Sequence, residues 1–324
     1  MFDWSDLKYF LAVARAGSTL AAAKTLNVNQ STVHRRLQEL EKRLGCQLVK
    51  RHPTGYRLTE LGREMLGHAE TVEAATATFE RRVAASSTEI KGTVKVTCPA
   101  ALGARLMRSP LLDDLGRRHP GLRVEFAMSD RNLDLAKGEA DIAIRAKAPS
   151  EDVLFGRKIG DSPWGIYASR AYVKRHGGIA RAEHIGDHAV VMFSGELRDH
   201  ASARWLNSVA LKARVAAHGS NLTALLMAVK SGAGLAPLPL IVGEAESDLV
   251  RVFGPVAEIA TPFYLLMHQD MRRTPRVRAV FDFLIEQLPV IRPLLSRAPK
   301  PAAKKPRRRR ATPRPAAAAA RRRR

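Results

Sequence analysis

Cysteine is scarce in this sequence: Cys46 and Cys98 are the only two in 324 residues, and they lie far apart. Two distant cysteines do not make a disulfide framework, so we expect the chain to fold in a reducing compartment. No apolar run approaches the ~20 residues needed to span a bilayer. The segment from Met1 to Asp6 carries acids where a secretory signal carries bases. We therefore expect a soluble, cytoplasmic protein without a membrane partner.

Signatures of catalysis and of cofactor binding are missing as well. The chain has no Gly-rich phosphate loop and no H-E-x-x-H, C-x-x-C or G-x-S-x-G motif. Its ten histidines are scattered without metal-ligand spacing. Gly232-Ala233-Gly234 follows an expected helix instead of preceding one, so it is not a nucleotide-binding fingerprint. The sequence predicts neither an enzyme nor a metal or cofactor site.

Acidic residues are absent from 297–324, which holds 13 of the 54 Lys and Arg residues. The remaining 41 basic and 31 acidic residues leave the body of the chain with a formal charge of +10. A basic surplus favours a polyanion, and nucleic acid is the first candidate. The segment 297–324 lacks periodicity, so we expect it to be a disordered basic tail. It either adds salt-sensitive binding to any DNA or only raises solubility.

Three helical patterns occupy the first 45 residues. An amphipathic helix over about 7–15 stops at Gly17, and Ser18 can cap a short second helix that ends at Leu26. A third helix runs from about Gln30 to Leu44 after a compact turn, with Asn29 placed to cap it and Gly45 to end it. Its apolar stripe must pack on the first two helices and consists of Val33, Leu37, Leu40 and Leu44.

The opposite, polar face of this third helix is free to enter a major groove, which is about 12 Å wide. Gln30 can pair with adenine and Arg35 with guanine. Two extended pieces, around 47–51 and 56–58, predict a hairpin whose basic residues reach the DNA backbone. The predicted DNA-binding residues are Ser18, Gln30, Ser31, Thr32, His34, Arg35, Gln38, Lys50, Arg51, His52 and Arg57. The alternative is a small helical bundle whose polar face is only solvated.

A long helix is expected from Thr59, its cap, to about Ala85. Met65, Val72 and Phe79 recur every seven residues, beside a second seam of Ala69, Thr76 and Val83. Such heptads favour pairing with another helix. After it, strand and helix patterns alternate, which indicates α/β architecture with mainly parallel sheets. Strands are expected at 93–97, 122–128, 141–145, 165–168, 190–193, 215–218, 235–237 and 263–268, and helices at 102–118, 133–136, 203–210, 222–231 and 276–287.

The first sixty residues resemble the LysR-type transcriptional regulators. Phe10-Leu11-Ala12-Val13-Ala14-Arg15-Ala16-Gly17-Ser18 is similar to the opening of that family, and Ala22-Ala23-Lys24-Thr25-Leu26 to its second helix. Further matching residues are Gln30 to Leu37, Leu40-Glu41, Leu44-Gly45, Leu48, Arg51, Leu58-Thr59 and Gly62. His34 and Val49 depart from the pattern, where Ser and Phe are usual. The resemblance covers about residues 1–290.

The resemblance implies a winged helix-turn-helix at 1–58, a dimerising linker helix at 59–88 and an effector-binding domain at 89–296. That domain would have a periplasmic-binding-protein-like α/β fold, with subdomain I at about 89–162 and 267–292 and subdomain II at about 163–266. The effector would lie between the subdomains, near the carboxyl ends of strands. The candidates are Pro99, Ala100, Ala101, Leu102, Ser129, Asp130, Arg145, Phe193, Ser194, His218, Ser220 and Asn221.

Several of these candidates also have a purely structural interpretation. Ser220 can be only a helix cap, Ser129-Asp130 only a turn, and Arg145 can pair with an acid in place of a ligand carboxylate. Cys98 can sense redox state, although a buried structural thiol is commoner.

The function that follows is an effector-responsive, sequence-specific transcriptional regulator. Its expected partners are double-stranded DNA, a small-molecule effector, a second copy in a homodimer or homotetramer and, for an activator, RNA polymerase. Two other classes stay open: a nucleoid-type architectural protein that binds any DNA, and a solute-binding protein or enzyme built on the α/β half.

Overall fold

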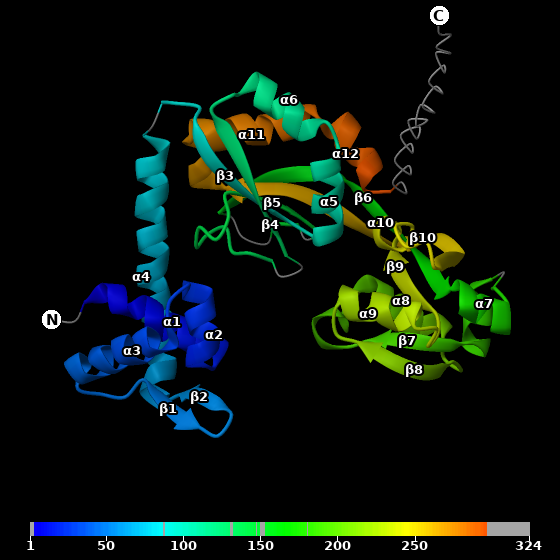
Figure 1. The fold of residues 1–324 in the computed structure, drawn as a ribbon, viewed down its shortest axis with the longest axis horizontal. Coiled ribbons are helices and arrows are strands. Elements are labelled where there is room, and N and C mark those ends of the chain that lie inside the picture. Colours follow the sequence, from blue (N-terminus) through cyan, green and yellow to red (C-terminus); the bar gives the residue numbers. More distant parts are fainter. Residues whose placement is uncertain are drawn as a thin grey trace, which may run out of the picture.

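The computed structural model describes residues 3–86, 88–129, 132–146, 148–149, 153–179 and 181–296. Asp130 and the basic segment 297–324, for which predictions were made above, lie outside these residues. A small helical unit lies at one end of the chain, a single long helix leads away from it, and two α/β subdomains follow (Figure 1). No helix among the described residues is both long and apolar enough to cross a membrane.

The N-terminal unit is a winged helix-turn-helix, as the sequence predicts. It comprises the 3-10 helix η1 (Trp4–Asp6), α1 (Leu7–Ala16), α2 (Thr19–Leu26), α3 (Gln30–Leu44) and the hairpin of β1 (Val49–His52) and β2 (Gly55–Leu58). The Ser18 hydroxyl caps α2, and Gly17 and Gly45 end α1 and α3 in the left-handed conformation. Asn29 stands at the expected cap of α3, but its side chain makes no capping hydrogen bond. Phe10, Val33, Leu37 and Leu40 form the buried core.

Helix α4 (Glu60–Ala85) begins where expected, because the Thr59 hydroxyl accepts from the amide of Gly62 at 2.9 Å. Ala69 is buried against the core of the N-terminal unit. Farther along, Phe79 is 70% exposed and Val83 is 56% exposed. The heptad pattern therefore leaves an apolar strip uncovered within one protomer.

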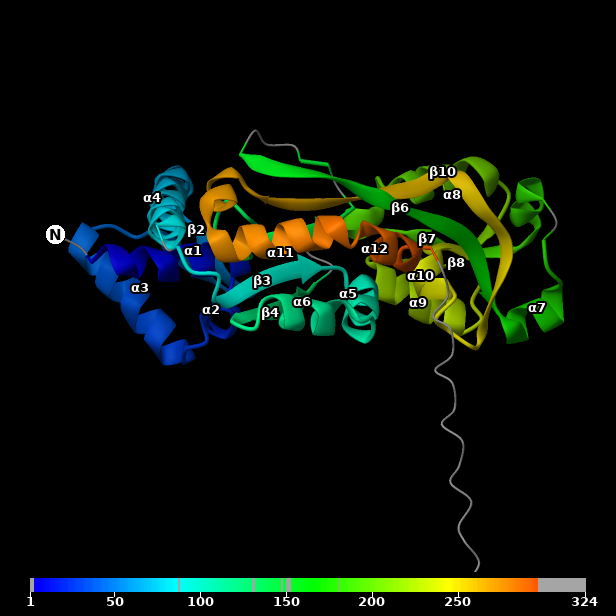
Figure 2. The same ribbon diagram turned by 90° about the horizontal axis from the view of Figure 1, so that it is seen from above.

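One six-stranded sheet runs through both subdomains, in the order β4-β3-β5-β10-β6-β9. Its strands are β3 (Gly92–Cys98), β4 (Leu122–Met128), β5 (Ile142–Arg145), β6 (Leu154–Ser169), β9 (Ala236–Pro239) and β10 (Leu249–His268). Only β3 with β4 and β3 with β5 are parallel, and the other three pairs are antiparallel. The prediction of mainly parallel strands is therefore wrong for this sheet, which is mixed. The long strands β6 and β10 pass from one subdomain into the other (Figure 2).

Each subdomain has its own buried core. In the first, α5 (Ala100–Arg108), α6 (Leu111–Arg118), α11 (Pro275–Glu286) and α12 (Leu288–Leu294) pack on the sheet around Val94, Ile142 and Leu265. In the second, α8 (Ala201–Val209) and α9 (Leu222–Lys230) pack near the parallel pair β7 (Ala189–Phe193) and β8 (Arg214–Gly219). The remaining elements are α7 (Arg170–His176), α10 (Leu240–Gly243), η2 (Ala182–Asp187), η3 (Gly195–Leu197) and η4 (Gln269–Arg273).

Four expected elements differ from the observed ones. The helix expected at 102–118 is two helices, because Ser109-Pro110 interrupts the backbone hydrogen bonding between α5 and α6. Residues 133–136 form no helix; a turn at 135–138 passes through Gly138 with φ +73°. The strands expected at 165–168 and 263–268 are the ends of β6 and β10, which are 16 and 20 residues long. Bulges in β10 interrupt the alternation that would have indicated its length.

Candidate nucleic-acid interface and ligand cleft

A polar groove of about 940 Å³ separates the start of α3 from the β1–β2 wing. Six of the eleven predicted DNA-binding residues line it: Ser18, Gln30, Ser31, His34, Arg51 and His52. Thr19, Pro53, Gly55 and Tyr56 complete the lining. The other five predicted residues, Thr32, Arg35, Gln38, Lys50 and Arg57, belong to the same unit but do not line the groove. Thr32 is half-buried and the other four are exposed.

Hydrogen bonds fix the side chains at the floor of the groove. The Ser18 hydroxyl accepts from the amides of Leu20 and Ala21 at 3.2 and 3.5 Å, so it acts as a helix cap. Gln30 donates through Nε2 to the buried hydroxyl of Thr19 at 3.0 Å. Sequence reasoning did not select Thr19, although its place directly after a capping serine is a usable signal. This hydrogen bond joins the first residue of α3 to the first residue of α2.

The wing is held by contacts that the sequence did not indicate. Glu41 on α3 accepts through Oε1 from the amides of Leu48 and Val49, at 2.7 and 3.0 Å. The amide of Tyr56 donates to the carbonyl of Gly17 at 2.7 Å. A Cβ atom at Gly55, where φ is +132°, would lie 2.2 Å from that same carbonyl oxygen. The hairpin therefore has a fixed position beside α3.

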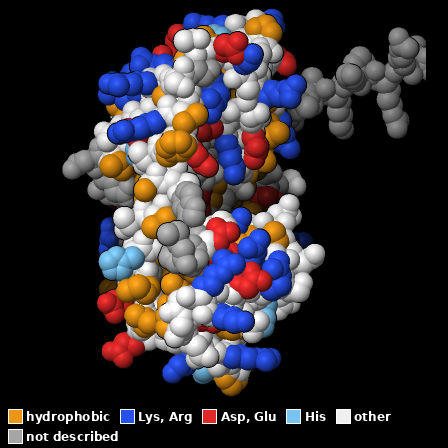
Figure 3. Space-filling view, turned by 90° about the vertical axis from the view of Figure 1, so that its left-hand side faces the viewer, with side chains coloured by type: hydrophobic (Ala, Val, Ile, Leu, Met, Phe, Trp, Pro, Cys, Tyr) orange, Lys and Arg blue, Asp and Glu red, His pale blue; other side chains and the backbone are white. Residues whose placement is uncertain are grey.

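Positive charge on this unit is partly neutralised and partly free. Arg35 pairs with Glu39 at 2.7 Å, and Arg36 and Arg43 pair with the buried Asp6 at 3.3 and 3.6 Å. Lys50 and Arg51 form no ion pair with any described residue, so they remain available to phosphate. Figure 3 shows Lys and Arg side chains at both ends of one face of the molecule, interspersed with acids.

A second cavity, of about 1030 Å³, lies between the two α/β subdomains. Six predicted effector residues line it: Pro99, Ala101, Ser129, Arg145, Ser220 and Asn221. The structure does not place Ala100, Leu102, Phe193, Ser194 or His218 on the cavity wall. Leu102 and Phe193 are buried in the two cores, because neighbouring residues of a helix or strand face different ways. Asp130 lies outside the described residues.

The cavity also has walls that sequence reasoning missed. Thr97, Asn132, Ser162, Trp164, His200 and Thr261 line it. Ser162, Trp164 and Thr261 belong to β6 and β10 near the crossing between subdomains, and the full length of those strands was not foreseen. The indole Nε1 of Trp164 donates to the Thr261 hydroxyl at 2.8 Å, across the two strands. Asn221, not Ser220, caps α9, because its Oδ1 accepts from the amide of Ala224 at 2.8 Å.

Arg145 gives the cavity its most distinctive polar group. Its Nε atom is buried and has no hydrogen-bond partner among the described residues. A buried N–H group without a partner is costly, and a ligand carboxylate would accept from it as part of a two-bonded pair with the guanidinium. Thr97, Ser162 and Ser220 are also on the lining, and the hydroxyls of Thr97 and Ser162 donate to the carbonyls of Ala127 and Leu295. The cavity therefore suits a small ligand that bears an acidic group and hydrogen-bonding groups.

Burial changes the acid–base behaviour of two other residues in the lining. The pKa of the His200 imidazole is lowered below 6.5, first by burial and then by the charge of Arg204. Its ring lies 4.9 Å from that of Trp164, and its Nδ1 accepts from the Ser202 amide at 3.2 Å. Burial raises the pKa of the Cys98 thiol to about 12. Both groups are therefore neutral at pH 7.

Metal binding has no visible site in the part of the chain that the structure describes. No three His, Cys, Asp or Glu side chains there are grouped so as to hold an ion.

Comparison with known proteins yields two family matches. Residues 4–63 match the bacterial regulatory helix-turn-helix family of LysR type, and residues 87–289 match the LysR substrate binding domain. The probable regulator LtrA of Klebsiella pneumoniae is 28% identical, over 88% of this chain and 95% of its own. A regulator from Xanthomonas campestris is 33% identical, but the alignment spans 54% of this chain and only 51% of that relative.

The full-length virulence activator AphB of Vibrio cholerae has the same fold. Its TM-score is 0.57 at 23% identity, over 88% of this chain and 99% of that one. The two family matches together span both the helix-turn-helix and the α/β part. The chain belongs to the LysR family of bacterial helix-turn-helix transcriptional regulators, which are not enzymes.

Proposed function

We propose that this regulator binds a specific duplex through the groove between α3 and the wing, and that a small acidic molecule in the subdomain cleft controls it. One observation carries the first half: the fold brings six separately predicted residues around a single groove. Gln30, Ser31 and His34 present groups that hydrogen-bond to base edges. Arg51 and Lys50 are placed on the wing for phosphate contacts.

The buried, unpartnered Nε of Arg145 supports the second half. A carboxylate in the cleft would pair with Arg145 in subdomain I and accept hydrogen bonds from Ser220 or Asn221 in subdomain II. Ligand contacts to both subdomains would favour a closed cleft over an open one. We propose the division 1–58, 59–88 and 89–296 for the three functional parts of the chain.

The exposed apolar strip on α4 supports a homodimer. Leu61, Phe79 and Val83 are 37%, 70% and 56% exposed on a helix with a heptad repeat. Pairing of two such helices would cover these residues and present two α3 helices to a dyad site. A tetramer built from two dimers, RNA polymerase as a further partner and a cytoplasmic location complete the proposal.

A selection from genomic DNA fragments tests the DNA half. It uses the full chain and a chain that ends at Ser296, without the basic tail. Recovery of the same short dyad sequence by both chains is expected. If the full chain retains every fragment and the shortened chain retains none, the tail is the DNA-binding element and the proposal is wrong.

A thermal-denaturation screen of small carboxylates, each with its matched amide, tests the ligand half. Binding to the folded state raises Tm. A carboxylate that raises the Tm of the wild-type chain should fail to do so for Arg145→Leu, whereas its amide should raise neither. The matched control is Arg123→Leu, an exposed arginine in β4 outside the cleft, which should respond as the wild type does. Stabilisation of Arg145→Leu equal to that of the wild type would contradict the assignment.

A further inference from the structure

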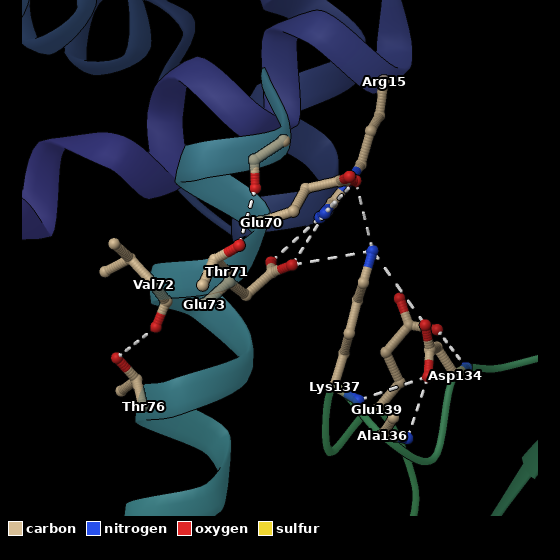
Figure 4. Close-up of polar contacts among 11 residues, drawn as sticks. Arg15, Glu70, Thr71, Val72, Glu73, Thr76, Asp134, Ala136, Lys137 and Glu139 are labelled. Atoms are coloured by element: carbon tan, nitrogen blue, oxygen red, sulfur yellow. Dashed lines mark hydrogen bonds and ion pairs between the residues drawn. The ribbon is translucent and has the colours of Figure 1, made fainter. Parts of the chain in front are cut away.

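The segment 132–146, which runs from the loop after β4 to the residue after β5, reaches both the cleft and the linker helix. At one end Asn132 and Leu133 line the cleft, and at the other end Arg145 and Ala146 line it. Between them, the turn 134–139 lies against α4 (Figure 4). A change of cleft shape that moves either end of this segment therefore has a direct path to the helix that carries the DNA-binding unit.

Two cations from different units meet on two carboxylates of α4. Arg15, from α1 of the DNA-binding unit, donates to Glu73 at 2.9 and 2.7 Å and to Glu70 at 3.1 Å. Lys137, from the turn, lies 3.4 Å from Glu70 and 3.7 Å from Glu73. Both cations use the same two atoms, Oε1 of Glu70 and Oε2 of Glu73. Movement of Lys137 therefore changes the electrostatic potential at Arg15, because the two cations share these carboxylates.

The turn that carries Lys137 is internally fixed. Asp134 accepts through Oδ1 from the amides of Ala136 and Lys137 at 2.9 and 3.2 Å. Glu139 accepts through Oε2 from the amide of Asp134 at 2.7 Å. Leu135 is buried in a small core with Ala143 of β5 and Leu266 of β10. These contacts tie the turn to itself and to the sheet, so we expect a displacement of the sheet to carry the turn with it.

Arg81, farther along α4, makes a second contact to the same turn. It is 7% exposed and donates through Nη1 to the carbonyl of Ala136 at 2.6 Å. It also lies 3.6 Å from Asp270 in η4. Glu70, Glu73 and Arg81 all lie on α4, so two separate places along the helix attach it to one short turn. Contacts at two points along a helix fix its direction, not only its position.

We propose that the turn 134–139 couples the cleft to the DNA-binding unit, with Lys137, Glu70 and Glu73 as positioning residues. This coupling rests on the proposed function, because it links a ligand in the cleft to a duplex on the DNA-binding unit. Occupation of the cleft shifts the turn, the two carboxylates redistribute between Lys137 and Arg15, and the DNA-binding unit changes its angle on α4. By linkage, binding of DNA affects the cleft through the same residues.

Charge reversal in the full-length chain tests the contact of Lys137 with Glu70 and Glu73, which we call the joint. Lys137→Glu places a carboxylate against Glu70 and Glu73, whereas Lys158→Glu makes the same change of net charge on an exposed lysine of β6. Affinity is measured for the duplex that the wild-type chain selects from genomic fragments. Lys137→Glu should weaken binding about threefold to tenfold, because the turn no longer holds α4 at this point and the helix that carries the DNA-binding unit is less preorganised. Adding Glu70→Lys should restore it, since the two exchanged charges can pair with each other again while Arg15 keeps Glu73. Lys158→Glu should bind as the wild type does.

Hydrogen exchange provides a readout that does not depend on DNA. In Lys137→Glu, the amides of the turn 134–139 and of the adjacent part of α4 should exchange faster than in the wild type and in Lys158→Glu, because the ion pairs that join the turn to α4 are lost. Unchanged exchange in the turn and α4 together with wild-type DNA affinity would overturn the joint, while the selection itself would still support a regulator. Failure of the wild-type chain to select any duplex would refute the proposed function instead, and exchange would still report on the joint.

The link to the cleft is tested with added bulk in place of a ligand. Ala146 is exposed on the cleft lining, so Ala146→Trp fills part of the cavity without disturbing a core. It should change DNA affinity in the wild-type background and have a smaller effect in the Lys137→Glu background. No effect in either background, or equal effects in both, would overturn the route through the turn.

Discussion

The side-chain amide of Gln30 donates to the Thr19 hydroxyl at 3.0 Å and so joins the first residue of α3 to the first residue of α2. Gln30 lines the groove, and its remaining side-chain N–H and carbonyl oxygen make no hydrogen bond to any residue that the structure describes. A glutamine that is already oriented loses less conformational entropy when it pairs with a base. In the proposed DNA complex, the second helix of the motif would thus contribute to recognition by orienting Gln30 through Thr19.

Replacing Arg35 should weaken specific DNA binding without unfolding the chain. Arg35 is 60% exposed on α3, and its pair with Glu39 is an exposed i,i+4 contact of small value to stability. Arg35→Ala should lower affinity for the selected duplex by about 1–3 kcal/mol. Titration of labelled duplex measures the change. Arg117→Ala, which removes a similarly exposed helix pair in α6, serves as the control. Equal affinity of Arg35→Ala and wild type would count against α3 as the recognition helix.

Two glycines of α4 should respond in opposite directions to the same substitution. A Cβ at Gly62 would lie 1.9 Å from the carbonyl oxygen of Leu48, whereas a Cβ at Gly67 meets nothing within 4 Å. Gly62→Ala should lower the free energy of unfolding by about 1–3 kcal/mol, because the wing must shift. Gly67→Ala should raise it by about 0.5–1 kcal/mol through helix propensity. Denaturant titration distinguishes the two, and a stable Gly62→Ala would show that the close packing of wing on α4 is incorrect.

Cys98 should be chemically inert in the folded chain. Its thiol is buried with a pKa of about 12, so the thiolate is about 10⁻⁵ of the population at neutral pH. Alkylation with iodoacetamide followed by mass spectrometry should modify Cys98 only after denaturation. Cys46, which is half-buried, is the internal comparison. Rapid native labelling of Cys98 would revive the redox-sensor interpretation that the sequence left open.

Stability should fall as the pH drops below about 6.5, and His200 should account for part of the fall. The folded-state pKa of His200 is lowered by burial and by Arg204, so the unfolded state takes up a proton first. Falling pH therefore favours unfolding. His200→Asn removes this titration and retains a capping group for the Ser202 amide. Its free energy of unfolding should decline less between about pH 7.5 and about pH 5.5. Parallel curves for variant and wild type would contradict the lowered pKa.

The sequence by itself determined the local elements. Periodicity and capping residues predict α1 to α4 closely, because Ser18, Thr59, Gly17 and Gly45 act within one helical turn of their own positions. Hydrophobic runs likewise locate β3, β4 and β5 to within a residue or two. The motif residues around Gln30 were enough to place the chain in its family. These features depend on interactions between near neighbours in the chain.

Only the tertiary structure decided which elements that are distant in the sequence contact one another. Whether strands run parallel or antiparallel depends on how β6 and β10 return through both subdomains, and no local pattern records that path. Cleft residues such as Trp164 and Thr261 are 97 residues apart and meet only through that pairing. Arg15, Glu73 and Lys137 come from three separate parts of the chain. Each is an ordinary charged residue in the sequence, and only the packing of α1 and the turn 134–139 on α4 brings them together.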